Sequence, residues 1–127
     1  MSKEQKFFIC KHCGNLVGFI DYVGVKVICC GEEMSELIAN TSDGATEKHV
    51  PVISQKGDEI EVSVGSAAHP MLEAHYIKWI YLLTEKGGQR KSLKPGEDPK
   101  VRFSLVDDKA IRAYAYCNLH GLWKADV

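Results

Sequence analysis

Four cysteines lie within the first thirty residues of the chain, in a pattern typical of metal binding. Cys10 and Cys13 form a C-x-x-C step, and the adjacent pair Cys29 and Cys30 follows after a gap of fifteen residues. A tight turn lets both sulfurs of a C-x-x-C step reach one ion, and Gly14 suits a turn whose backbone N–H groups point at sulfur. The spacing therefore predicts a site of four sulfurs.

The adjacent pair needs a special backbone, because neighbouring side chains of an extended strand point to opposite faces. Cys29 and Cys30 can share one ion only where the chain bends sharply, which Gly31 permits, so we expect a distorted tetrahedron. Tetrahedral sulfur suits both zinc and iron, and the spacing alone also fits a structural zinc ribbon. We expect His12 to be an exposed turn residue, since four sulfurs complete the shell.

A second set of possible ligands is scattered through the rest of the chain. Cys117 lies three residues before His120, and His49, His69 and His75 each lie beside turn-forming or strand-starting residues. Each histidine alone is typical of a structural residue. If all four converge with Cys117, however, four imidazoles and one thiolate exceed the four ligands of a structural zinc and suit iron better.

Composition limits the classes of function. The 127 residues carry 16 basic and 17 acidic side chains, a net charge of −1, so no basic surface for nucleic acid or anionic membranes is expected. The longest apolar stretches are far shorter than the roughly 20 residues of a membrane-spanning helix. The apolar run Phe7–Ile9 is too short for a secretory signal, which predicts a cytoplasmic protein.

The sequence divides into three parts. Residues 1–36 carry the four cysteines and too few apolar residues for a core of their own, so a metal must hold them together. Residues 37–46 are mostly polar and are predicted to form a linker. Residues 47–127 are predicted to form a second domain.

Period-two alternation dominates the second domain and predicts β-strands. Apolar residues alternate with polar ones around Ile60–Val64 and Val101–Leu105, while Tyr76–Leu83 is almost continuously apolar apart from Lys78. Turn signals at 56–58, 87–88 and 95–99 separate the strands and favour an all-β sandwich. The remaining predicted strands are Lys6–Ile9, Leu16–Ile20, Val25–Ile28 and Ala110–Cys117. A plain binding sandwich without metal is the alternative from pattern alone.

These motifs together resemble desulfoferrodoxin, the two-iron superoxide reductase family of anaerobic and microaerophilic microbes. The resemblance spans nearly the whole chain. Its motifs are C-K-H-C-G at 10–14, C-C-G at 29–31, E-K-H-V-P-V at 47–52, H-P-M at 69–71, H-Y-I at 75–77, L-K-P-G at 93–96 and C-N-L-H-G-L-W at 117–123.

The resemblance implies a desulforedoxin-like first domain followed by an immunoglobulin-like β-sandwich, with one iron in each. It implies reduction of superoxide to hydrogen peroxide at the second iron, as a detoxification reaction. Carried over by position, the ligands of the first iron are Cys10, Cys13, Cys29 and Cys30, and those of the catalytic iron are His49, His69, His75, Cys117 and His120.

The resemblance also implies roles for Glu47 and Lys48, which precede His49. Glu47 is expected to bind the oxidised iron and Lys48 to attract superoxide, although pattern alone favours an ordinary solvated loop. Family likeness further suggests a rubredoxin-type electron donor and a homodimer. A non-enzymatic electron carrier is the main competing class, but it would leave the four histidines and Cys117 unexplained.

Overall fold

The structure is a computed structural model, and it describes residues 4–127. Internal contacts divide the chain into two compact units, one ending at Ile38 and the other running from Ala39 to Val127. The predicted all-β class is confirmed: within the described residues, β-strands account for almost all regular structure and one four-residue helix is present.

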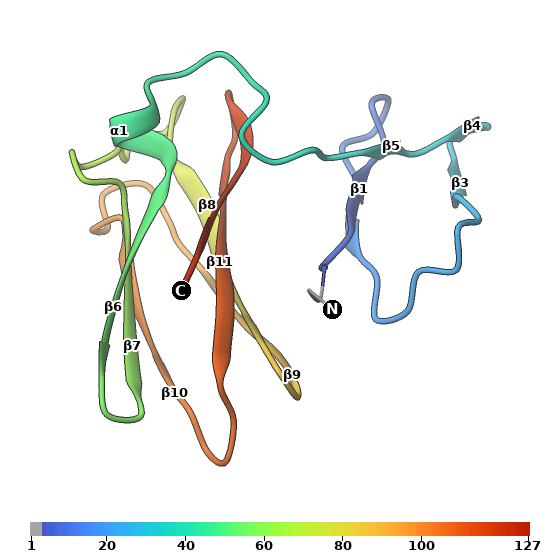
Figure 1. Cartoon of the computed structure of the whole chain (residues 1–127). Coiled ribbons are helices and arrows are strands. Elements are labelled where there is room, and N and C mark those ends of the chain that lie inside the picture. The colour runs from blue at the N-terminus through green and yellow to red at the C-terminus, as the bar shows by residue number, and fades with distance from the viewer. Residues whose placement is uncertain (1–3) are drawn as a thin grey trace. The chain divides into compact units, whose positions relative to one another are not determined.

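The first unit consists of short strands. Strand β1 is the centre of a three-stranded antiparallel sheet in the order β2-β1-β5, and β3 pairs with β4 (Figure 1). The bounds are β1 Phe7–Ile9, β2 Leu16–Gly18, β3 Ile28–Cys29, β4 Glu32–Glu33 and β5 Ser35–Glu36. The prediction of a strand over Val25–Ile28 was wrong, since β3 begins only at Ile28. Gly24 has a φ of +92°, which breaks the extended backbone, and Val25 is 71% exposed.

The core of the first unit is very small. Phe8, Cys10 and Met34 form its buried cluster, and Phe7 is buried as well. The rings of Phe19 and Tyr22 pack against Phe8, with centroid distances of 5.1 and 5.3 Å. A core of this size favours the predicted need for a metal to hold the unit together.

The second unit is a two-layer β-sandwich (Figure 1). One sheet has the order β10-β7-β6 and the other β12-β11-β8-β9, and all pairings are antiparallel. A short helix, α1, precedes β6. The bounds are α1 Thr46–His49, β6 Pro51–Lys56, β7 Glu59–Val64, β8 Ile77–Thr84, β9 Gly87–Ser92, β10 Lys100–Ser104, β11 Ala110–Cys117 and β12 Gly121–Asp126.

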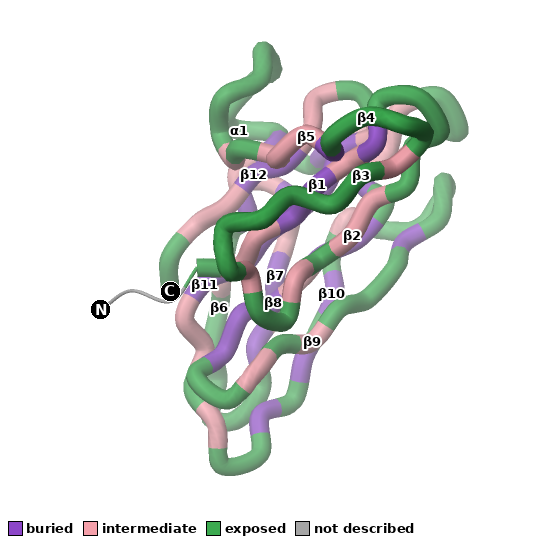
Figure 2. Tube along the Cα trace, turned by 90° about the vertical axis from the view of Figure 1, so that its right-hand side faces the viewer, coloured by how far each residue is buried: buried purple, intermediate pink, exposed green. Residues whose placement is uncertain are grey.

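The inner faces of the two sheets form the core of this unit. Ile60, Val62 and Val64 of β7 are fully or almost fully buried, as their alternation with polar residues predicts. Ile80 and Leu82 of β8 belong to the same apolar cluster. Figure 2 shows the buried positions recurring along these strands. Burial of this apolar layer fixes the strand ends from which the site residues project.

The hairpin between β8 and β9 differs from the sequence prediction. Its turn residues are Glu85 and Lys86, whereas Gly87 and Gly88 belong to β9. The side chain of Tyr81 lies where a side chain at position 88 would have to be. Gly88 is therefore required by the ring packed against it and not by a turn.

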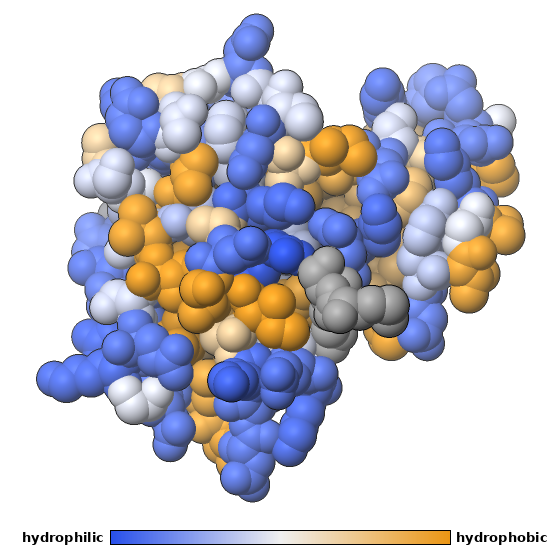
Figure 3. Space-filling view, in the orientation of Figure 1, coloured by the Kyte–Doolittle hydropathy of each residue, from blue (hydrophilic) through white to orange (hydrophobic). Residues whose placement is uncertain are grey.

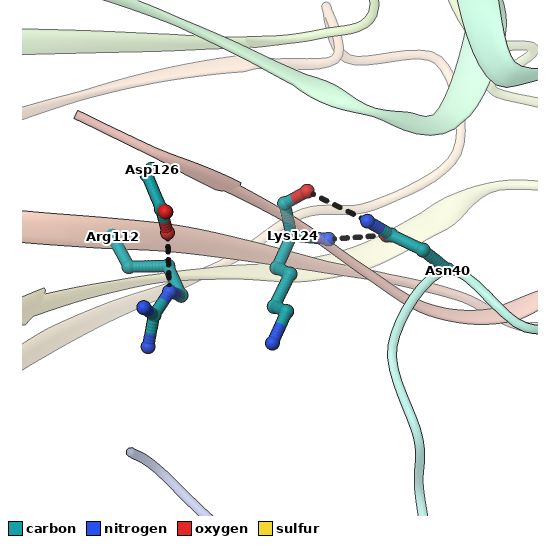
Figure 4. A network of polar contacts seen from close by, with 4 residues as sticks. All are labelled: Asn40, Arg112, Lys124 and Asp126. Atoms are coloured by element: carbon teal, nitrogen blue, oxygen red, sulfur yellow. Dashed lines mark hydrogen bonds and ion pairs between the residues drawn. The ribbon is translucent and has the colours of Figure 1, made fainter. Parts of the chain in front are cut away.

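The beginning of the second unit is attached to strand β12. The Asn40 side chain hydrogen-bonds both backbone groups of Lys124: Nδ2 donates to the carbonyl oxygen at 3.2 Å, and Oδ1 accepts from the N–H at 2.8 Å (Figure 4). Asn40 N–H also donates to the carbonyl oxygen of Leu122. These bonds satisfy backbone groups along β12, which ends the four-stranded sheet.

Hydrophilic residues make up much of the surface seen in Figure 3, with patches of apolar residues between them. Exposed apolar side chains of the first unit include Ile20 and Val23, which are 99% and 84% exposed. Within residues 4–127, no helix has the length and apolar character that crossing a membrane requires.

Candidate metal centres

The structure brings the four sulfurs of Cys10, Cys13, Cys29 and Cys30 together, all within 4.8 Å of one another. Gly14 has a φ of +85°, and its N–H donates to the carbonyl oxygen of Cys10, which closes the expected turn. Such a turn brings both sulfurs of the C-x-x-C step to one side.

The expected bend at the second cysteine pair is confirmed. Strand β3 ends at Cys29, and Cys30 and Gly31 both have left-handed backbones, with φ values of 54° and 76°. The bend turns two neighbouring side chains toward the same point. His12 is exposed, and its Nε2 lies 3.3 Å from Glu32 Oε2, so it is not part of the sulfur cluster.

Hydrogen bonding within the sulfur cluster moves the pKa values of Cys10 and Cys30 in opposite directions. Hydrogen bonding from the backbone N–H of Cys13 lowers the pKa of Cys10 to about 6. Hydrogen bonds to Cys13 and Cys10, together with desolvation, raise the pKa of Cys30 to about 12. Four clustered thiols cannot all ionise beside one another, and a bound cation would relieve that repulsion. Four thiolates around one cation suit iron or zinc.

The second cluster gathers at one end of the sandwich. His49 is the last residue of α1, His69 lies in the loop after β7, and His75 lies just before β8. Cys117 ends β11 opposite Ile77 of β8, and His120 lies in the turn between β11 and β12. Three separate chain segments, namely α1, the connection between β7 and β8, and the turn between β11 and β12, therefore contribute to one cluster.

The donor atoms of this cluster are close enough to share one ion. His49 Nε2 lies 3.1 Å from both His69 Nε2 and His120 Nδ1. Cys117 Sγ lies 3.9 Å from His120 Nδ1. Donor atoms of His49, His69, His75 and Cys117 all lie within 4.8 Å of one another. The centroid of the His75 ring is 5.0 Å from that of His120.

Hydrogen bonds outside the cluster fix which nitrogens face inward without a proton. His49 Nδ1 lies 2.8 Å from the Ala45 carbonyl oxygen, and His69 Nδ1 lies 2.7 Å from the Pro70 carbonyl oxygen. A carbonyl accepts only, so both Nδ1 atoms donate, and in neutral rings both Nε2 atoms carry lone pairs. His75 Nε2 is buried and has no hydrogen-bond partner. Lone pairs that face each other at 3.1 Å need a cation between them, and the residues present fit a bound metal.

Burial keeps these rings in the neutral form that binds metal. It lowers the pKa of His69 to about 4, with further lowering from His49, His75 and His120. Burial also lowers the pKa of His49 and of His75. Lys48 adds to the lowering of the pKa at both His49 and His75, whereas the Glu47 carboxylate raises the pKa of His49 by more than Lys48 lowers it, so both charges act on the cluster.

Cys117 and His120 are held by the turn that follows β11. The backbone N–H of His120 donates to Cys117 Sγ at 3.4 Å. Trp123 Nε1 donates to the His120 carbonyl oxygen at 3.0 Å, and the Trp123 ring packs 4.9 Å from the His49 ring. Trp123 therefore supports two members of the cluster at once.

Glu47 and Lys48 lie on α1, beside the cluster, and both are exposed. The Glu47 carbonyl oxygen accepts hydrogen bonds from the Ala67 N–H at 2.8 Å and from the Ser66 hydroxyl at 3.3 Å. These bonds connect α1 to the loop that carries His69. The charged side chains remain free to face solvent.

The sequence interpretation missed several supporting residues. Trp123 was quoted only as part of a motif, and Asn118 was given no role. The one signal for Asn118 was its place between Cys117 and His120. Contacts with Ala74 and Tyr76, more than forty residues earlier, could not be read from local pattern.

Comparison with known proteins places the chain in a family. A sequence model of the desulfoferrodoxin family matches residues 41–126. Desulfoferrodoxin of Nitratidesulfovibrio vulgaris is 46% identical over 127 residues and covers all of both chains. A protein of Pyrococcus horikoshii named superoxide reductase is 38% identical over 105 residues, covering 68% of this chain and 91% of its own length.

Comparison with solved structures also finds superoxide reductases. The superoxide reductase of Treponema pallidum has a TM-score of 0.83 at 42% identity, covering 98% of this chain and all of its own. The superoxide reductase of Giardia intestinalis, described as 1Fe-SOR, has a TM-score of 0.56 at 34% identity, covering 64% of this chain and 97% of its own. The chain belongs to the desulfoferrodoxin family, which confirms the resemblance read from its motifs.

Proposed function

We propose that this chain is a superoxide reductase, which combines superoxide with one electron and two protons and releases hydrogen peroxide. The convergence of four imidazoles and one thiolate at one end of the sandwich carries this proposal. Membership of the desulfoferrodoxin family and relatives named superoxide reductase support it.

The two clusters differ in what they offer a metal. Four sulfurs complete a tetrahedral shell, whereas five donors exceed the usual shell of zinc and suit iron with one further position open. The proposed ligands of the first iron are Cys10, Cys13, Cys29 and Cys30, and those of the catalytic iron are His49, His69, His75, Cys117 and His120. When bound at the second cluster, ferrous iron supplies the electron and an open position for a small anion.

Charge near the second cluster favours an anionic substrate. Ferrous iron with four neutral imidazoles and one thiolate has a formal charge of +1, while the whole chain has a net charge of −1. Attraction of superoxide must therefore be local. Lys48 is exposed beside the cluster and its charge acts on His49 and His75, so it is placed to add to that attraction.

Two neighbouring groups are proposed to tune the site. The His120 N–H is directed at Cys117 Sγ, and with a metal bound it would withdraw electron density from the thiolate and temper its donation to that metal. Glu47, whose backbone is anchored by Ala67 and Ser66, is proposed to bind the oxidised site and to leave it on reduction. Glu47 and Lys48 are exposed beside the buried cluster, which would give solvent protons access to the product.

The electron donor, the oligomeric state, the cellular location and the domain bounds are also proposals. Each turnover consumes one electron, which calls for a one-electron carrier of the rubredoxin type. Exposed apolar side chains such as Ile20 and Val23 on the first unit favour a homodimer. A cytoplasmic location is proposed from the short apolar run Phe7–Ile9. We propose residues 1–36 as the desulforedoxin-like domain and 47–127 as the catalytic domain, with 37–46 linking them.

Metal analysis with a visible spectrum tests the function most directly. Protein made in iron-containing medium should hold about two irons per chain, absorb visible light, and oxidise its ferrous catalytic site when mixed with superoxide. Hydrogen peroxide should form without oxygen, because reduction and not dismutation is proposed. A colourless protein that retains zinc at both clusters would contradict the proposal.

A further inference from the structure

We propose that Asn118 is a positioning residue that sets the orientation of His75 in the second cluster. This role rests on the proposed function, because it takes His75 as a metal ligand. It concerns neither a ligand nor a substrate contact but the backbone that carries one of the imidazoles.

His75 differs from two other histidines of the cluster. His49 and His69 each have a carbonyl oxygen within 2.8 Å of Nδ1, which fixes the plane of the ring. Among residues 4–127, the His75 ring makes no hydrogen bond, and its Nε2 is buried without a partner. The direction of His75 Nε2 therefore depends on how firmly its backbone is held.

The Asn118 amide holds that backbone on both sides of His75. Nδ2 donates to the carbonyl oxygen of Ala74 at 3.1 Å, and Oδ1 accepts from the N–H of Tyr76 at 2.9 Å. The backbone N–H of Asn118 also donates to the Tyr76 carbonyl oxygen at 3.2 Å. A planar amide, with a donor and an acceptor at fixed separation, suits this two-point contact.

On its other side, His75 is bound to a tight turn. Its backbone N–H and carbonyl exchange hydrogen bonds with those of Leu72, at 3.0 and 2.9 Å. Because Asn118 follows Cys117 directly, its side chain ties the sulfur-bearing turn to the segment carrying His75. A shift of either segment would change the distance between the Cys117 sulfur and His75 Nε2.

A pair of asparagine variants separates positioning from general stability. Asn118→Ala removes both side-chain bonds. Asn40→Ala is the matched control, because Asn40 makes the same two kinds of bond to the backbone of Lys124, whose neighbours along the chain include no ligand of the cluster (Figure 4). Iron release to a chelator is measured at each cluster separately, together with the ferric absorption band of the second cluster and the melting temperature.

We expect Asn118→Ala to release iron from the second cluster about tenfold faster than the unchanged protein, with a shifted ferric band. The four-sulfur site of the same sample should release iron at its normal rate. Asn40→Ala should lower the melting temperature and leave both the release rate and the band unchanged. Normal release and a normal band in Asn118→Ala would overturn the proposal.

Asn118→Asp keeps the test decisive if the alanine variant does not fold. The carboxylate still accepts from the Tyr76 N–H but cannot donate to the Ala74 carbonyl oxygen. It should also release iron faster, and a release rate equal to that of the unchanged protein would contradict the role of Asn118. An unchanged protein that binds no iron at this cluster would instead contradict the proposed function.

Discussion

His49 Nε2 lies 3.1 Å from Nδ1 of His120, although 71 positions separate the two residues along the chain. The two rings are nearly perpendicular, with an angle of 86° between their planes. Opposite ring nitrogens thus meet at one point, because His49 points in from the end of α1 and His120 from the turn after β11. The Nδ1 atom of His49 donates to Ala45, so the neutral ring presents the lone pair of Nε2 at this point, where a metal shared with His120 can accept it.

Removing one sulfur from each cluster should have different effects on superoxide reduction. Cys117→Ser should abolish superoxide reduction, because it removes the thiolate from the histidine cluster. Cys13→Ser should bleach the absorption of the four-sulfur iron yet leave superoxide reduction largely intact with an artificial electron donor. Metal content and rapid mixing with superoxide measure both effects. Equal loss of activity in the two variants would refute the division of roles.

Lys48→Ala should slow the second-order reaction with superoxide by about tenfold at low salt, because a local positive charge is lost. The rate should also depend less on ionic strength, since less attraction remains to be screened. Lys109→Ala is the control, because Lys109 is exposed beside the opposite end of β11. An unchanged rate and salt dependence in Lys48→Ala would remove this residue from the mechanism.

Glu47→Ala should alter the visible spectrum of the ferric protein and leave the reaction of the ferrous protein with superoxide fast. The reason is that the carboxylate is proposed to bind only the oxidised site. Spectra of both oxidation states and rapid-mixing rates check the two halves of the prediction. A ferric spectrum identical to that of the unchanged protein would argue against binding by Glu47.

Gly65 is needed where the loop carrying His69 meets α1. A Cβ at this position would lie 2.7 Å from the Glu47 carbonyl oxygen and 2.9 Å from that of Val50, so backbone must move. Gly65→Ala should lower the free energy of unfolding by about 1–3 kcal/mol and speed iron loss from the second cluster.

Gly57→Ala is the control for this effect. A Cβ there would meet no atom within 4 Å, although its φ of +62° makes the backbone strained for alanine. It should cost about 1–2 kcal/mol and leave iron loss unchanged. Normal iron retention in Gly65→Ala would show that the loop adjusts without disturbing α1.

The metal-free protein should lose stability as the pH falls below 6.5. Burial lowers the pKa of His69 from 6.5 to about 4, so between these values the unfolded chain binds more protons than the folded chain. The stability of the neutral ring is fully present above pH 6.5 and is lost as the pH falls toward 4. Thermal unfolding at several pH values should show this slope, and His69→Gln should flatten it. Equal slopes in the two proteins would contradict the assignment.

Local spacing was enough to predict much of this protein. The cysteine pairs, with glycines after them, predicted both the sulfur cluster and the sharp bend at Cys30. Alternation in β7 and β10 predicted their buried faces, because a strand with one face in a core must repeat every second residue. These features depend on neighbours within a few residues.

Other features were settled by contacts between distant segments. Helix α1 has only four residues, too few for a helical period to be recognised, and it is held by bonds from the loop beyond β7. The strand predicted over Val25–Ile28 is mostly absent, because Gly24 breaks the extended backbone and Val25 is exposed. The apolar pattern of this segment does not reveal that exposure. Gly88 leaves room for the side chain of Tyr81, which lies on the neighbouring strand β8.

The sequence by itself determined which residue types were available to bind metal and which strands would bury their alternate faces. Only the tertiary structure decided that His49 and His120 meet through different nitrogens, and that Asn118 would hold the backbone around His75. The physical reason is the separation along the chain of the residues that interact. Turns and alternation arise from interactions between near neighbours, whereas ring orientation and hydrogen bonds between loops follow from how the sheets place segments that are far apart in the chain.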